Sequence, residues 1–135
     1  MTLIKWTKIY SVNILEVDNQ HKKLVDLFNN LYTAMKAGKA KEIMSTTLDE
    51  LVDYTLYHFA TEENLFDKYK FPESEAHKRE HKELVEKVAA LQKKHQSGER
   101  VLTIDVMNFL KDWIHNHIMG RDILFGEFLN SKGVY

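Results

Sequence analysis

Residues 44–65 read MSTTLDELVDYTLYHFATEENL, and this stretch has the periodicity from which the fold can be predicted. Its regularly spaced residues recur at alternating steps of four and three: Met44, Leu48, Leu51, Thr55, His58, Glu62 and Leu65. That period places them on one face of an α-helix. The sequence predicts that this helix begins near Ala40 and ends before Phe71-Pro72, because the residue ahead of a proline is disfavoured in the helical conformation.

Three further stretches have the same period. The first follows Asp18, a predicted N-cap, and stops at Gly38; the third is closed by Ser97-Gly98; the fourth starts near Thr103. Their regularly spaced residues are His21, Leu24, Phe28, Leu31 and Met35 in the first, His77, His81, Leu84, Val88, Leu91 and His95 in the third, and Val106, Leu110, Trp113, His117 and Leu124 in the fourth.

Four amphipathic helices with short connections bury their apolar faces against one another. The predicted fold is therefore all-α, an antiparallel up-down-up-down four-helix bundle formed by a single domain over residues 1–135. A non-periodic N-terminal arm containing Trp6 and Tyr10 precedes it.

Composition excludes several classes of site and partner. The chain has 135 residues, a formal net charge of -1, seven histidines and no cysteine. Disulfides, iron–sulfur clusters and thiolate zinc sites are excluded, so a metal must be held by imidazole and oxygen. The charge predicts no nucleic-acid partner, and the sequence shows neither a membrane segment nor the apolar core of a signal peptide, so we expect a cytoplasmic protein.

Two pairs of residues have the spacing of metal ligands on a helix. Residues four apart lie one turn apart on nearly the same face, so His58 with Glu62, and His77 with His81, can each converge on one ion. A single buried histidine is more often a hydrogen-bonded core residue. Antiparallel helices can nevertheless bring these four residues, His21 and His117 to one level, and this joint pattern favours a metal site.

Of three further histidines, only one is predicted to belong to that site. His115 and His117 point to nearly opposite sides of a helix, and His117 shares its face with Trp113 and Leu110. His115 accompanies Lys111 on the solvated side, and His95 lies at the far end of its helix. We therefore expect surface roles for His115 and His95.

The motifs Asp18-Asn19-Gln20-His21-Lys22-Lys23-Leu24, His58-x-x-x-Glu62, His77-x-x-x-His81 and Trp113-Ile114-His115-Asn116-His117-Ile118-x-x-x-Asp122 follow one another along nearly the whole chain. In this order they resemble the successive motifs of the hemerythrin family, and its bacterial branch in particular. The resemblance implies two iron ions, Fe2+ or Fe3+, joined by an oxo or hydroxo bridge. It implies one iron bound by His77, His81 and His117, a second bound by His21 and His58, and Glu62 and Asp122 bridging them.

Asp122 depends on the resemblance alone. A spacing of five rotates it about 140° from His117 on a regular helix, away from the predicted core face. A local widening of the π type would return it toward that face, and such insertions often occur at functional sites. We therefore hypothesise a π-type turn between His117 and Asp122.

Five neutral nitrogens and two carboxylates make a site poorer in anionic oxygen than the Glu-rich di-iron oxidases. This favours reversible O2 binding for transport, storage or delivery over enzymatic oxygen activation. The expected O2 pocket consists of Trp113, Ile114, Ile118 and Leu24, for each of which ordinary core packing is an equal alternative. Other functions stay open: a di-iron oxidase or peroxidase, a sensor of O2 or NO, an iron-handling module, or a metal-free or zinc-loaded bundle. The sequence identifies no recipient protein for the oxygen.

Overall fold

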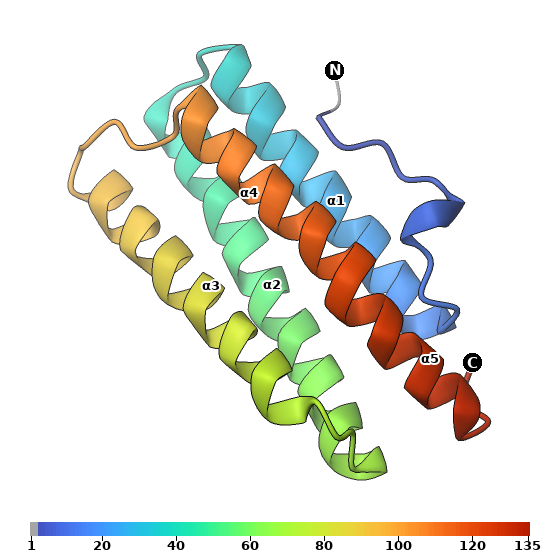
Figure 1. The fold of residues 1–135 in the computed structure, drawn as a ribbon. Helices are drawn as coiled ribbons and strands as arrows, with labels where there is room; N and C mark the ends of the chain where they lie inside the picture. Colours follow the sequence, from blue (N-terminus) through green and yellow to red (C-terminus); the bar gives the residue numbers. More distant parts are fainter. Residues whose placement is uncertain (1–2) are drawn as a thin grey trace.

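Four long helical segments lie side by side and alternate in direction, which confirms the predicted four-helix bundle (Figure 1). The structure is a computed structural model that describes residues 3–135. The helices are α1 (Leu15–Lys36), α2 (Lys41–Tyr69), α3 (Ser74–Gln96) and a fourth segment made of α4 (Ile104–His117), the π-helical η2 (Ile118–Asp122) and α5 (Ile123–Ser131). None of these described helices is long and apolar enough to cross a membrane.

The predicted helix ends are confirmed. At the ends of α1 and α3, Gly38 and Gly98 adopt φ values of +62° and +100°, and the following residues donate backbone hydrogen bonds that satisfy the last carbonyls. Helix α2 stops at Tyr69, two residues before Phe71-Pro72. The Thr103 hydroxyl caps α4 by accepting a hydrogen bond from the Val106 backbone N–H.

The predicted N-cap role of Asp18 is wrong. Helix α1 begins at Leu15, and the Asp18 backbone N–H already donates to the Ile14 carbonyl. The Asp18 carboxylate instead accepts hydrogen bonds from the Val12 backbone N–H at 2.8 Å and the Ser11 hydroxyl. Asp18 therefore holds the N-terminal arm against the first turn of α1.

The arm, residues 3–14, runs along the bundle beside α1 and the fourth segment and contains the short 3-10 helix η1 (Lys8–Tyr10) (Figure 1). Buried Asn29 of α1 accepts hydrogen bonds from the backbone N–H groups of Leu3 and Ile4 and donates to the Ile4 carbonyl. The Tyr10 hydroxyl lies 2.9 Å from His115 Nδ1. These contacts fix a segment that has no helical period of its own.

Two apolar clusters fill the bundle, with polar residues between them along each helix. On α1, Val17 belongs to one cluster and Leu24 to the other, with His21 between them. On α2, Phe59 and Phe66 flank Glu62 in the same way. The fold thus creates a polar layer inside an otherwise apolar core.

The π-helical segment η2 changes which residues of the fourth segment face inward. Its wider turn absorbs one residue, which sets the following side chains back by about 100° relative to a regular helix. Leu124, predicted to face the core, is therefore 53% exposed, while Phe125 is fully buried. The hypothesised π-type turn is present, and it corrects the assignment of Leu124.

Candidate metal centre

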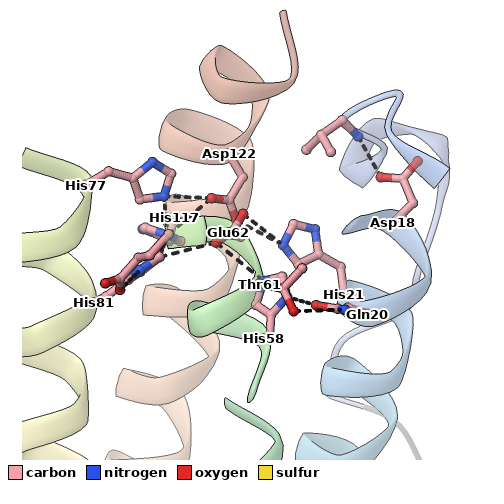
Figure 2. A network of polar contacts seen from close by, with 12 residues as sticks. Asp18, Gln20, His21, His58, Thr61, Glu62, His77, His81, His117 and Asp122 are labelled. Atoms are coloured by element: carbon pink, nitrogen blue, oxygen red, sulfur yellow. Dashed lines mark hydrogen bonds and ion pairs between the residues drawn. The ribbon is translucent and has the colours of Figure 1, made fainter. Parts of the chain in front are cut away.

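Seven side chains meet in the polar layer, and they are the seven singled out in the sequence. His21 comes from α1, His58 and Glu62 from α2, and His77 and His81 from α3, while His117 ends α4 and Asp122 ends η2 (Figure 2). All seven are buried. Helical spacing on α2 and α3, and the π-helical turn after His117, bring them to one level.

The side chains form two groups that share both carboxylates. One group contains His77, His81 and His117, and the other contains His21 and His58; Glu62 and Asp122 belong to both. Within each group, one nitrogen or oxygen atom per residue lies within 4.8 Å of the others. The arrangement therefore offers two adjacent sites for cations rather than one.

Asp122 spans the two groups. Its Oδ1 lies 2.8 Å from His77 Nε2 and 3.3 Å from His117 Nε2, while its Oδ2 lies 3.0 Å from His21 Nε2 (Figure 2). Glu62 of α2 also spans the two groups. Its Oε1 lies 3.2 Å from His81 Nε2 in one group and 3.5 Å from His58 Nε2 in the other. Each carboxylate could thus bind two cations at once.

The chemistry of these donors fits metal ions. The Nε2 atom of His117 lies 3.0 Å from that of His77 and 3.2 Å from that of His81. The four carboxylate oxygens of Glu62 and Asp122 are buried, and the ion pairs that they form among the described residues are with the Nε2 atoms of the cluster imidazoles. Buried carboxylates cost free energy unless they are paired or coordinate a metal. Two divalent cations would satisfy the converging nitrogens and the carboxylates together.

Burial shifts the pKa values of the cluster in the direction that metal binding requires for its imidazoles. It lowers the pKa of His58 to about 3, with the neighbouring His21 adding to the effect, and it lowers the pKa values of His77 and His81. These imidazoles are therefore neutral near pH 7 and can act as ligands.

The pKa values of the two carboxyl groups are shifted in opposite directions. Burial and the nearby Asp122 raise the pKa of Glu62 well above its ordinary value. Burial also acts to raise the pKa of Asp122, but the adjacent His117, His21 and His77 hold it well below its ordinary value. The carboxyl group of Asp122 is therefore a stronger acid than that of Glu62.

Two polar residues that were not predicted as ligands orient the imidazoles. His58 Nδ1 lies 2.8 Å from Gln20 Oε1, and His81 Nδ1 lies 3.0 Å from Glu63 Oε2. In each pair the imidazole donates its Nδ1 hydrogen, which leaves the Nε2 lone pair facing the cluster. Gln20 directly precedes His21 within the first of the quoted motifs, and Glu63 directly follows Glu62.

Aromatic rings fix the imidazoles from the apolar side. Phe59 stacks on His81 with ring centroids 3.7 Å apart, and Trp113 stacks on His117 at 4.4 Å. Trp6 of the arm lies 6.5 Å from the His21 ring. An aromatic side chain thus lies beside His81, His117 and His21.

The two remaining histidines lie outside the cluster. His115 is partly exposed and contacts Tyr10 of the arm, so it is not a cluster member. His95 was expected on the surface, but it is only 5% exposed. The chain turns at Gly98 and returns toward α4, and the cavity formed there is lined in part by His95.

Three of the four expected O2-pocket residues line a narrow apolar cavity of about 30 Å3. They are Leu24, Trp113 and Ile114, and Phe59 lines the same cavity. Ile118 is buried in the same apolar cluster but does not line this cavity. The cavity begins beside the rings that stack on the cluster and continues into the apolar core.

Comparison with known proteins identifies the family that shares this arrangement. The family model of the hemerythrin HHE cation binding domain matches residues 13–128. A bacteriohemerythrin of Methylococcus capsulatus is 38% identical over 132 residues, which cover 97% of this chain and 100% of the relative. A hemerythrin-like protein of Naegleria gruberi is 32% identical and covers 89% and 88% of the two chains.

Solved structures of hemerythrin have the same fold as this chain. The crystal structure of a wild-type hemerythrin superposes with a TM-score of 0.89 at 37% identity, and the match covers 94% of this chain and 98% of that one. A point mutant of hemerythrin gives a TM-score of 0.91 at the same identity. The match thus extends over the whole bundle and includes the segments that carry the cluster.

Proposed function

Because the chain belongs to the hemerythrin family, whose members bind a non-haem di-iron centre, we propose that its seven clustered residues hold two iron ions that bind O2 reversibly. One iron would be held by His77, His81 and His117, and the other by His21 and His58. Glu62 and Asp122 would bridge them. The observation that carries the proposal is the sharing of both carboxylates between a group of three histidines and a group of two.

One group has three histidines and the other has two, and this difference supports O2 binding at one particular iron. With Glu62, Asp122 and three imidazoles, the first iron would have one more protein ligand than the second. The iron held by His21 and His58 would therefore be the one with room for a further ligand. The iron pair would supply the electrons and the open coordination position that O2 needs.

The protein's own residues would keep that position dry. Leu24, Trp113 and Ile114 line the apolar cavity beside the cluster, and its volume of about 30 Å3 is sufficient for a molecule of the size of water or O2. Apart from the Thr55 hydroxyl and the Trp113 indole N–H, the described lining residues offer no polar side-chain group, which disfavours water. Thr55 donates its hydroxyl hydrogen to the Leu51 carbonyl within α2. An apolar cavity of this kind favours a neutral diatomic ligand over water and ionic reductants.

The test begins with the purified protein, loaded with iron and reduced without oxygen. We expect two irons per chain and a visible absorption band that appears when O2 is admitted and disappears when O2 is removed. Irreversible oxidation would contradict reversible binding, and steady consumption of a reductant or of peroxide would indicate an oxidase or peroxidase.

A matched pair of variants separates the site from its surroundings. His117→Gln removes a cluster nitrogen, whereas His115→Gln changes a histidine on the same helix that faces the arm. We expect iron to be lost from the first variant and both irons to remain in the second. Equal iron contents in the two variants would contradict the assignment of ligands.

A further inference from the structure

A second cavity lies at the end of the bundle where α1 turns into α2 and α3 turns into α4, the upper end in Figure 1. Its volume is about 640 Å3, within the range of small-molecule sites. The cluster ligands lie near the opposite ends of the same helices, at the start of α1 and α3 and the end of α4. This cavity is therefore separate from the candidate metal centre.

The rim of the cavity is basic. Lys36, Lys39, Lys41 and Arg100 line it, and Glu99 is the only acidic residue among the described lining residues. None of these four basic residues takes part in the ion pairs formed between described residues. The Lys41 ammonium lies close to Gly98, where a Cβ would be 3.8 Å from its nitrogen. Four unpaired cations around one hollow favour an anionic occupant.

The start of α2 adds backbone donors at this end. The last turns of α1 and α3 lie here as well, where Lys39 and Glu99 donate their N–H groups to the Ala34 and Lys94 carbonyls. The 29-residue helix α2 begins at Lys41, and its N-cap, Ala40, has no side chain that could accept its first N–H groups. An uncapped helix N-terminus binds anions through these N–H groups.

A buried histidine independently indicates a ligand. His95 lines the cavity and is only 5% exposed, and its Nε2 atom has no hydrogen-bond partner among the described residues. A buried imidazole nitrogen without a partner costs about 1–3 kcal/mol. A polar ligand atom that reaches this nitrogen would remove this cost.

We propose that this cavity binds a small organic phosphate. A phosphate monoester carries a charge of about -1.5 to -2 at pH 7, which suits the excess of cations better than a carboxylate does. Its charged group would lie between Lys41, Arg100 and the start of α2. Its apolar part would pack on Met35, Met44 and Leu102, which line the cavity as well.

The experiment titrates the iron-loaded protein with phenyl phosphate, using benzoate as the carboxylate control, and follows the methionine methyl groups by NMR. We expect the Met35 and Met44 methyl signals to shift, with tighter binding of phenyl phosphate than of benzoate. Met119 lies within η2, next to the metal cluster, where paramagnetic iron broadens its signal, so the visible absorption of the iron serves as the control and should stay unchanged. A change in that absorption without shifts of Met35 and Met44 would mean that the phosphate binds at the metal centre, and it would overturn the proposal.

Charge-removing variants provide the decisive comparison. Lys41→Gln combined with Arg100→Gln should weaken phenyl phosphate binding about tenfold or more, because two charge-assisted contacts are lost. Lys68→Gln combined with Lys132→Gln removes the same charge outside the cavity lining and should leave the affinity unchanged. Equal affinities in the two double variants, or no binding at millimolar concentration, would overturn the proposal. All four positions are on the surface, so each variant should retain its helical circular dichroism.

Discussion

At the scale of single residues, the cluster depends on side chains that do not belong to it. Glu63 accepts the Nδ1 hydrogen of His81, and Gln20 accepts that of His58. Sequence spacing could identify the ligands because two of the pairs lie four residues apart. It could not identify these outer partners, because a glutamate or glutamine beside a ligand is common on the solvated side of any helix.

Replacing Glu63 tests this outer contact. Glu63→Ala should weaken iron binding about 10–100-fold, because the His81 ring loses the acceptor that fixes its orientation. Iron retention against a chelator measures the effect. Glu63→Gln keeps an acceptor oxygen and should restore most of the affinity, and Glu50→Ala on the exposed side of α2 is the control. A loss of the same size in Glu50→Ala would show that the effect is general.

Ile114 tests the apolar cavity. Ile114→Glu would place a carboxylate beside the cluster, where it admits water and can compete for the open iron position. We expect loss of reversible O2 binding and faster autoxidation, both followed by visible absorption. Ile104→Glu on the same helix, at a position 45% exposed, should behave as the unmodified protein does. Unchanged oxygen affinity in Ile114→Glu would remove the cavity from the proposed function.

At the scale of helices, the boundaries were largely predictable because glycine, proline and capping residues mark them. The π-helical turn was not predictable from periodicity. A regular helix would turn Asp122 away from His117 and Leu124 toward the core, and η2 reverses both. Only the resemblance to a family indicated Asp122. The start of α1 was misplaced because Asp18, a good capping residue, is instead used to hold the arm.

Two glycines of the fourth segment give a matched test of how the arm packs. A Cβ on Gly126 would lie 2.2 Å from the Val12 carbonyl oxygen, whereas a Cβ on Gly120 would meet nothing within 4 Å. Gly126→Ala should therefore lower the free energy of unfolding by about 1–3 kcal/mol, because the arm must move. Gly120→Ala should be neutral or stabilising. Urea unfolding measures both, and equal effects would contradict the close contact between arm and α5.

At the scale of the whole molecule, the polar layer makes stability depend on pH and metal. In the metal-free protein, the lowered pKa values of His58 and His81 mean that the unfolded chain binds protons that the folded chain does not. Stability should then fall as the pH is lowered from about 6.5, the ordinary histidine value, toward about 3, where His58 itself titrates in the folded protein. The raised pKa of Glu62 acts in the opposite direction above pH 4.5.

Three imidazoles with lowered pKa values, those of His58, His77 and His81, outweigh the one carboxyl group with a raised pKa, so stability should fall overall as the pH is lowered from 6.5 to 4.5. Urea unfolding of the chelator-treated protein across this range measures it. His81→Leu should flatten the dependence. Iron binds the deprotonated ligands of the folded state, so it should raise stability near neutral pH and be released in acid. A stability independent of pH would contradict the burial of neutral imidazoles.

The chain contains two tryptophans, and each lies against a cluster histidine. Trp113 stacks on His117, and Trp6 lies 6.5 Å from the His21 ring on the other side of the layer. Coloured, paramagnetic ions at such short range quench indole fluorescence efficiently. The tryptophan fluorescence of this protein should therefore be weak when both metal positions are filled and strong when they are empty. Metal occupancy could be followed optically, without a label, in the unmodified molecule.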